Sequence, residues 1–213
     1  MKKYLWIMAL CLCFAKGNAQ GNADARKVLD ATAAQVTGQG GVKARFKADS
    51  FTDGNLQGSV SGTMCLQGEK FRMDTPEMVT WYNGETQWSY VKANEEVNVS
   101  VPTPEERQAM NPYAFVHLYK EGYGLALKET VLRGKPCYEV TLADQSGQKA
   151  LRTIILDIDR RTSVPMCVRM QRREDGQWTR IAIHQFRSGQ AFDAADFEFS
   201  PADYPQAEVI DLR

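Results

Sequence analysis

The sequence predicts a mainly β protein of the α+β type, in which one large antiparallel sheet curls around a few short helices. Three observations predict this fold class. Apolar and polar residues alternate with a period of two from Val42 almost to the C-terminus. The dipeptides Asn83-Gly84 and Asp175-Gly176 are typical of β-hairpin turns. Helical periodicity is confined to residues 24–36 and to the stretch 103–119.

The composition is that of an ordinary globular protein. Of the 213 residues, 43% are hydrophobic, which suffices for one sizeable core. Lys and Arg together number 26 and Asp and Glu also number 26, so the formal net charge is zero. Proteins that bind nucleic-acid phosphates carry a basic excess, so no nucleic-acid partner is expected. No linker of biased composition divides the chain, which favours a single domain.

The N-terminus has the features of a secretory signal peptide, residues 1–19. Two lysines precede an apolar stretch, residues 4–15, that is too short to span a bilayer. Gly17 and Ala19 are small residues placed as a signal peptidase requires, so we expect cleavage after Ala19 and a mature chain that begins at Gln20. Neither cysteine of the apolar stretch follows a small residue, as a lipidation signal demands. We therefore expect a soluble exported protein.

The motifs of common enzymes and metal sites are missing from the sequence. GxSxG, the P-loop, GxGxxG and HExxH do not occur. Signal cleavage leaves three cysteines, at positions 65, 137 and 167, and none of them has metal-ligand spacing. The chain contains only two histidines. We therefore expect no metal, no cofactor and no catalytic residue.

One arrangement keeps an enzyme as the alternative. If Asp175-Gly176 forms a two-residue turn, Cys167 lies opposite His184 on a polar face that also carries arginines. Nearby guanidinium groups would favour a thiolate. A nucleophile and its base normally sit in a pocket with a third group that orients them, so we favour a protein that is not an enzyme.

The two turns also predict which apolar residues share a face of the sheet. Pairing outward from Asn83-Gly84 places Val79 opposite Trp88. The apolar face of this first hairpin then carries Val79, Trp81, Trp88 and Tyr90. Pairing outward from Asp175-Gly176 places Val168 opposite Ile183. The apolar face of this second hairpin then carries Met166, Val168, Met170 and Ile183.

These faces create a packing problem. A flat sheet of about ten or eleven strands would expose more apolar area than the short helices can cover, so the sheet must curl. Its interior is either a filled core or a ligand cavity. Methionine suits both, because its flexible side chain lines acyl-chain sites and also fills gaps in cores. The mature chain has methionines at positions 64, 73, 78, 110, 166 and 170.

Helix signals are clear at a few positions. Residues 24–36 predict an amphipathic helix that ends at Gly38, and Thr103 and Glu106 have the spacing of a capping box. A second short helix is expected to start at Asn111-Pro112.

An apolar stripe follows that second start. Phe115, Leu118 and Tyr119 recur at helical spacing, so they must face something apolar. The stripe either closes a cavity as a lid or belongs to a filled core, and we favour the lid.

Several stretches, in their order along the chain, resemble the LolA-like periplasmic lipoprotein carriers. They are Lys70-Phe71-Arg72-Met73, the turn Trp81-Tyr82-Asn83-Gly84 followed by Trp88-Ser89-Tyr90, Asn111-Pro112, Leu156-Asp157-Ile158-Asp159, and the C-terminal runs that start at Phe197 and Val209. One position departs from the family pattern. Its proteobacterial members carry an arginine shortly before the residue that matches Phe71, where this chain has Gln67 or, with a shifted gap, Gly68. In those members the arginine connects the lid to the sheet, so its absence implies a different contact between lid and sheet in this chain.

The resemblance implies a fold and a function. The fold is an unclosed β-barrel with short helices as a lid or plug, formed by residues 20–213 as a single LolA-like domain. The function is that of a monomeric periplasmic carrier, which takes acylated lipoproteins from an inner-membrane lipoprotein-releasing transporter and passes them to an outer-membrane acceptor. The alternative is a sensor of the same fold that recognises lipid or lipoprotein without transporting it. The acyl-chain-binding residues are expected to be Val79, Trp81, Trp88, Tyr90, Phe115, Leu118, Met166, Val168, Met170 and Ile183.

Overall fold

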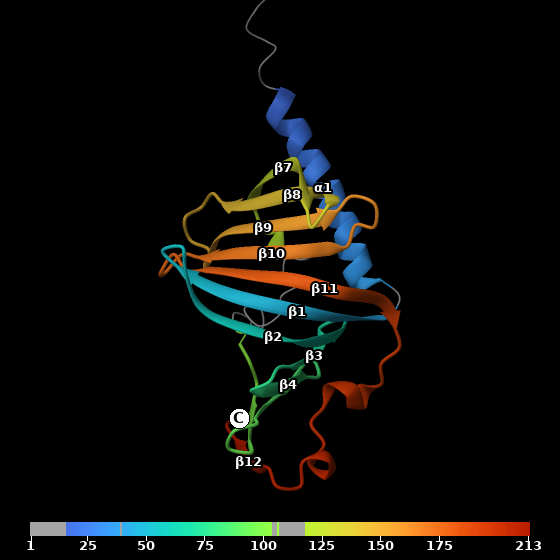
Figure 1. Ribbon diagram of the computed structural model, residues 1–213, viewed down its shortest axis with the longest axis vertical. Helices are drawn as coiled ribbons and strands as arrows, with labels where there is room; N and C mark the ends of the chain where they lie inside the picture. Colours follow the sequence, from blue (N-terminus) through green and yellow to red (C-terminus); the bar gives the residue numbers. More distant parts are fainter. Residues whose placement is uncertain (1–15, 39, 104–105, 107–117) are drawn as a thin grey trace, which may run out of the picture.

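The computed structural model describes residues 16–38, 40–103, 106 and 118–213. Within them the chain forms one α-helix and a single open sheet of twelve strands (Figure 1). The predicted mainly β fold with one large unclosed sheet is confirmed, with a strand more than the ten or eleven expected. The strands are β1 Gly41–Thr52, β2 Asn55–Gln67, β3 Lys70–Asp74, β4 Met78–Tyr82, β5 Gln87–Val91, β6 Glu96–Ser100, β7 Tyr123–Leu132, β8 Lys135–Asp144, β9 Leu151–Asp159, β10 Pro165–Arg172, β11 Trp178–Gln190 and β12 Glu208–Asp211.

The strands follow the order β12-β6-β5-β4-β3-β2-β1-β11-β10-β9-β8-β7 across the sheet. Neighbours are antiparallel, as predicted, except that β12 pairs with β6 in parallel. A C-terminal segment leads from β11 to β12 through two short 3-10 helices, η1 Ala194–Phe197 and η2 Pro201–Asp203. It runs alongside β3 and β4 to the far end of the molecule (Figure 1).

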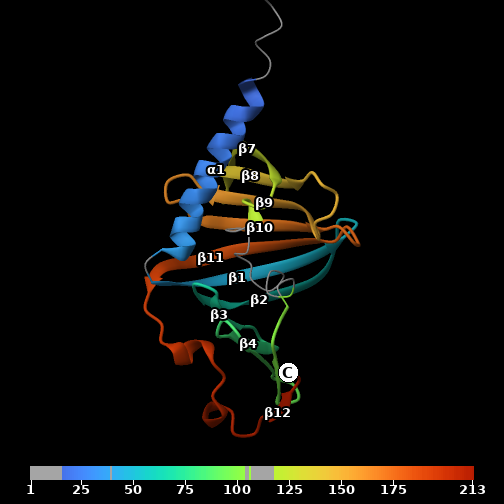
Figure 2. The same ribbon diagram turned by 180° about the vertical axis from the view of Figure 1, so that it is seen from behind.

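Helix α1 spans Lys16–Thr37, so it starts earlier than the predicted residues 24–36 and ends where predicted, before Gly38. The predicted cleavage after Ala19 falls in its first turn and stays a prediction. The helix packs against β7 and β8 (Figure 2). Its predicted apolar stripe faces the sheet, because Ala25 and Leu29 are buried in the main hydrophobic cluster. We call the face of the sheet that α1 covers the inner face and the opposite one the outer face.

The capping box at the predicted start of the next helices is present. The backbone N–H of Thr103 donates to Oε2 of Glu106 over 2.8 Å, and the backbone N–H of Glu106 donates to Oγ1 of Thr103 over 3.2 Å. The helices expected between residues 107 and 117, with Asn111-Pro112 and Phe115, lie outside the described residues.

The first hairpin has a different register from the predicted one. Val79 pairs with Tyr90, and not with Trp88, because the turn is centred on Gly84 and Glu85. Gly84 adopts a φ of +104°, which glycine tolerates, and the Asn83 side chain accepts hydrogen bonds from the next two backbone N–H groups of the turn, at Glu85 and Thr86. A shift of two residues preserves side-chain alternation, so the predicted set still shares one face.

The second hairpin is also shifted by two residues. Val168 pairs with Ile181, and not with Ile183, because the turn is centred on Glu174 and Asp175. The backbone N–H of Arg172 donates to the carbonyl of Gln177 and closes this longer loop. The apolar and polar faces again keep their predicted residues, except for Met166, where β10 is irregular.

Charged residues on the outer face of β8 to β11 form ion pairs. The Arg169 guanidinium lies 2.9 Å from the Glu139 carboxylate and 3.2 Å from that of Asp157. The buried Asp49 carboxylate accepts hydrogen bonds from Ser59 over 2.6 Å and from Arg180 over 2.7 Å. These contacts satisfy the charges that the period-two pattern places on this face.

The Asp49 network predicts a pH dependence of stability. The hydrogen bonds from Ser59 and Arg180 lower the pKa of Asp49 from 3.8 to about 2. Because the folded pKa lies below the unfolded one, the stabilisation is complete above pH 4 and is lost as the pH falls from about 4 to about 2. The free energy of unfolding, measured by denaturant titration at several pH values, should fall more steeply in this window for wild type than for Asp49→Asn. Parallel curves for the two proteins would show that Asp49 does not contribute.

Candidate functional site

An apolar pocket of about 560 Å³ opens on the inner face, over β1, β2, β3 and β11 and the adjoining ends of β4 and β5. Register places its residues side by side, because Phe46 pairs with Ile183 on one side and with Gly62 on the other. The Phe46 ring lies over Gly62, where an added Cβ would come within 2.4 Å of the Asp74 carbonyl oxygen. The lining residues are Phe46, Ala48, Val60, Met64, Met73, Thr75, Glu77, Met78, Val91 and Ile181.

The chemistry of this pocket is that of a hydrocarbon site. Three of its lining residues are methionines, whose unbranched side chains adapt to ligands of different shape. Its polar lining residues, Thr75 and Glu77, lie at one end, where the Thr75 hydroxyl and the Met78 backbone exchange hydrogen bonds of 3.0 Å. Lys92 donates to the Asp74 carboxylate over 2.9 Å and to the Thr75 carbonyl over 2.6 Å. The wall therefore offers an apolar chain a surface from which water is displaced favourably.

Two polar atoms lie unpaired on the inner face, one beside the pocket and one at the far end of β5 from it. In the described part of the chain, the hydroxyl of Thr80 and the side-chain carbonyl of Gln87 are buried without a hydrogen-bond partner. Thr80 is 2% exposed and pairs across the ladder with Met73, which lines the pocket. Buried polar atoms are normally satisfied, so these two could take a polar group of a ligand.

The family follows from the sequence pattern. Residues 15–177 match the pattern of the family described as outer membrane lipoprotein carrier protein LolA, which is well over half of the chain. The chain belongs to this family. No curated protein matches it significantly.

Solved structures resemble this LolA-family chain at low sequence identity, and one of them has a TM-score above 0.5. An uncharacterized conserved protein from Thermus thermophilus has a TM-score of 0.58 at 12% identity, over 88% of this chain and 99% of that chain. A putative outer membrane lipoprotein-sorting protein domain from Vibrio parahaemolyticus has a TM-score of 0.46 at 12% identity, over 85% and 97%. The MucA/MucB complex from Pseudomonas aeruginosa contains a chain with a TM-score of 0.42 at 15% identity, over 83% and 61%.

The predicted acyl-chain residues of the second hairpin lie on the inner face, beside the pocket. Val168 and Ile183 are buried in the main cluster, and Met170 packs against it. Val168 and Ile183 each pair with a lining residue, Ile181 and Phe46 respectively. Met166 lies elsewhere, because β10 is irregular between Pro165 and Cys167 and the Met166 sulfur lies 3.5 Å from that of Cys137.

The predicted residues of the first hairpin lie on the outer face, which corrects the expectation that they line the same cavity. Trp81 pairs with Arg72 in register, whereas the neighbouring pair Phe71 and Tyr82 faces the main cluster. The reason is a second apolar layer, because the C-terminal segment covers this face with Phe199 and Tyr204. The ring centroids of these residues lie 5.8 and 5.5 Å from that of Trp81. None of the four predicted residues, Val79, Trp81, Trp88 and Tyr90, lines the apolar pocket.

Two of the three residues of the predicted lid stripe lie within the described residues. Leu118 and Tyr119 are buried in the main cluster at 4% and 2% exposure, and Phe115 lies outside the described residues. The Tyr119 hydroxyl donates to the Asp30 carboxylate of α1. Burial and this carboxylate raise the pKa of Tyr119 to about 12, so the hydroxyl keeps its proton and the hydrogen bond persists at physiological pH. Tyr119 thus joins the start of the 118–122 turn to the helix.

The prediction that Cys167 lies opposite His184 is wrong, because the register of β10 and β11 separates the two residues. Cys167 pairs with Ala182, while Nδ1 of His184 lies 2.8 Å from the Arg133 guanidinium. Burial raises the pKa of Cys167 to about 11, so the thiol is protonated and the expected thiolate does not form.

The described residues offer neither a cluster of metal ligands nor a membrane-spanning helix. They contain no group of three or more His, Cys, Asp and Glu side chains that could hold a metal ion. None of the described helices is long and apolar enough to cross a membrane.

The pocket itself was only partly predictable. Met64, Met73 and Met78 line it, but in the sequence these methionines fit an acyl-chain site and a filled core equally. Phe46, Ala48 and Val60 were visible only as members of alternating strands. No local signal distinguishes a strand residue that lines a cavity from one that fills a core.

Proposed function

We propose that this LolA-family protein is a periplasmic carrier that binds the acyl chains of lipoproteins in the apolar pocket and ferries them from the inner to the outer membrane. The observation that carries the proposal is a pocket of about 560 Å³ with a methionine-rich wall. This volume lies in the range of about 300–1,000 Å³ usual for ligand sites. Each methylene buried there contributes about 0.8 kcal/mol.

The remaining parts of the proposal follow from its chemistry. A protein that carries acyl chains through water needs a donor and an acceptor, so the partners are an inner-membrane transporter that releases lipoproteins and an acceptor at the outer membrane. Thr80 and Gln87 supply unpaired polar atoms for the glyceryl or ester region of the bound lipid. The protein acts as a monomer after export and removal of residues 1–19.

The first test identifies the ligand. Native mass spectrometry of protein purified from the periplasm should show complexes whose extra mass matches a diacylated or triacylated polypeptide. A protein that carries only free lipid under the same conditions would overturn the transport role and favour the sensor of the same fold.

The second test places the ligand in the pocket. Ala48→Trp fills the pocket from β1, so it should weaken the binding of a fluorescent fatty-acid probe about tenfold or more, since it removes space for several methylenes. Ala143→Trp on the exposed side of β8 is the matched control and should bind the probe as wild type does. Equal affinity in wild type and Ala48→Trp would exclude this pocket as the binding site.

A further inference from the structure

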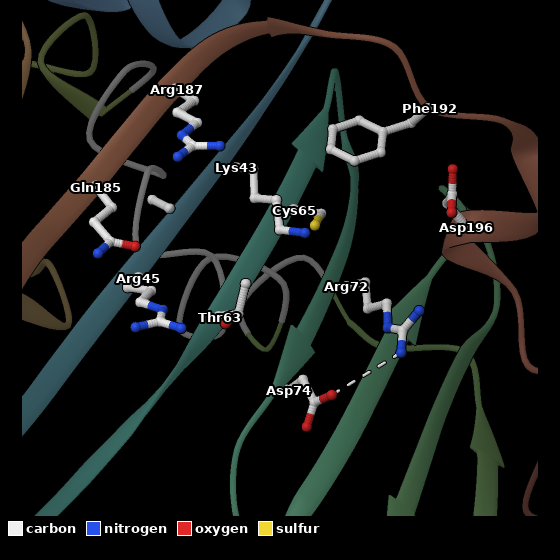
Figure 3. A pocket seen from close by; sticks show the side chains of 11 residues that line it. Lys43, Arg45, Thr63, Cys65, Arg72, Asp74, Gln185, Arg187, Phe192 and Asp196 are labelled. Atoms are coloured by element: carbon white, nitrogen blue, oxygen red, sulfur yellow. Dashed lines mark ion pairs between the residues drawn. The ribbon is translucent and has the colours of Figure 1, made fainter.

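The outer face carries a second pocket of about 440 Å³ with the opposite character (Figure 3). Four cationic side chains line it, from three strands: Lys43 and Arg45 of β1, Arg72 of β3 and Arg187 of β11. Its two acidic side chains, Asp74 and Asp196, give the lining an excess of two positive charges. This basic pocket lies on the far side of the sheet from the apolar pocket.

Three of the four cations are unpaired. The side chains of Lys43, Arg45 and Arg187 form no hydrogen bond or ion pair with any residue that the structure describes. Of the two acids, Asp74 lies 4.0 Å from the fourth cation, Arg72, and binds Lys92 over 2.9 Å, and Asp196 accepts the backbone N–H of Asp193 over 2.8 Å. The basic pocket therefore presents positive charge that nothing within the described chain neutralises.

Other arginines on the outer face are paired with acids, so unpaired positive charge is not general to this face. Arg169, Arg173 and Arg180 each lie within 3 Å of a carboxylate oxygen. These three arginines are thus paired with acids, whereas Lys43, Arg45 and Arg187 of the basic pocket are not.

Local backbone structure holds the cations together. The pairing of β1 with β11 is irregular between Lys43 and Arg45, and Gln185 adopts a φ of +48° there. This β-bulge adds one residue to β11, which returns Arg187 to the outer face beside Lys43. Without the bulge, alternation from His184 would turn Arg187 inward.

The wall of the basic pocket is also fixed. The Phe192 ring lies against Gly41, where an added Cβ would come within 2.4 Å of it. Phe192 in turn packs edge-on against the fully buried Phe197 at 5.5 Å between ring centroids. Figure 3 shows this ring and Asp196 on one side of the basic pocket and Arg45 and Arg187 on the other, with Arg72 nearer to Asp196.

The spread of charge indicates the shape of the ligand. Arg187, Lys43 and Arg72 follow a register row across β11, β1, β2 and β3. Neighbouring strands are about 4.8 Å apart, so the outer two of these strands are about 14 Å apart. A single small anion covers only part of that length. An extended peptide rises about 3.4 Å per residue, so acidic side chains at three alternate positions also span about 14 Å.

We propose that the basic pocket docks an extended acidic segment of a partner protein. Carboxylates at alternate positions would meet the unpaired guanidinium and ammonium groups, and the Phe192 ring would contact the small residues between them. The site lies on the opposite face from the apolar pocket, so both can be occupied together.

The test uses the mature protein and a labelled peptide of alternating glutamate and alanine. Fluorescence anisotropy at low ionic strength should show binding that weakens with added salt, and a glutamine-alanine peptide should not bind. The triple variant Lys43→Gln, Arg45→Gln, Arg187→Gln should bind at least about tenfold more weakly. The matched triple variant Lys27→Gln, Arg152→Gln, Arg161→Gln removes three exposed cations elsewhere and should bind within about twofold of wild type.

Other outcomes would overturn the proposal. Equal losses in both triple variants would show non-specific attraction. Full displacement of the peptide by inorganic phosphate at equal concentration would show a small-anion site, and equal binding of phosphatidylglycerol vesicles would show a membrane surface. Both variants should still bind the fatty-acid probe, so the result is independent of the proposed carrier function.

Discussion

Replacing Phe197 by alanine should lower the free energy of unfolding by about 3–5 kcal/mol, one of the largest losses expected from a single substitution in this protein. Phe197 ends η1, is fully buried and packs against Phe192. It lies in the C-terminal segment, outside the main cluster, and helps to hold that segment on the outer face. The C-terminal segment has few other buried side chains that could compensate for the loss of this ring.

The measurement combines stability with a local probe. Denaturant unfolding gives the free energy, and tryptophan emission reports on Trp81, which the C-terminal segment buries to 3% exposure. We expect a lower midpoint and red-shifted emission in Phe197→Ala. Phe199→Ala removes a half-buried ring from the same segment and should cost less. A Phe197→Ala protein with wild-type stability and emission would show that the segment is held by β12 alone.

Leu118→Glu should also destabilise the protein by more than about 4 kcal/mol and broaden or abolish its cooperative thermal transition. Leu118 is 4% exposed within the main cluster, and its neighbour Tyr119 is bonded to Asp30 of α1. A glutamate there would be buried without a partner, since the cluster is apolar.

This result would decide between the two roles considered for the stripe. The sequence favoured a lid, for which the helix could lift and the glutamate could reach water at little cost. Leu118→Met keeps the volume and should lose less than about 1.5 kcal/mol. A near-normal melting curve for Leu118→Glu, together with weaker binding of the fatty-acid probe, would restore the lid interpretation.

The two hairpins show how much of the structure the local sequence pattern predicts. In both, the turn dipeptide marked the right place, and alternation grouped the side chains that share a face, with Met166 as the exception. In both, the centre of the turn lies one residue away from the expected position, because the Asn83 side chain caps one turn and a longer loop closes the other. That shift was enough to separate Cys167 from His184.

The first hairpin also shows why the candidate site was only partly predicted. Alternation separates two faces of a strand, but it does not say which partner covers each one. Trp81 is as apolar as the residues that face the main cluster, yet Phe199 and Tyr204 pack against it from more than a hundred residues further along the chain. The basic pocket was missed for a related reason, because its cations come from strands far apart in the sequence.

The sequence by itself determined the mainly β class, the end of α1 at Thr37, the capping box at Thr103 and, apart from Met166, which residues of each hairpin share a face. These features depend on residues within a few positions of one another, so backbone preference and period suffice. Only the tertiary structure decided the strand order, the parallel pairing of β12 with β6, the bulge that places Arg187 and the contents of the two pockets. Those depend on which distant segments bury one another's apolar faces, and no local pattern contains that information.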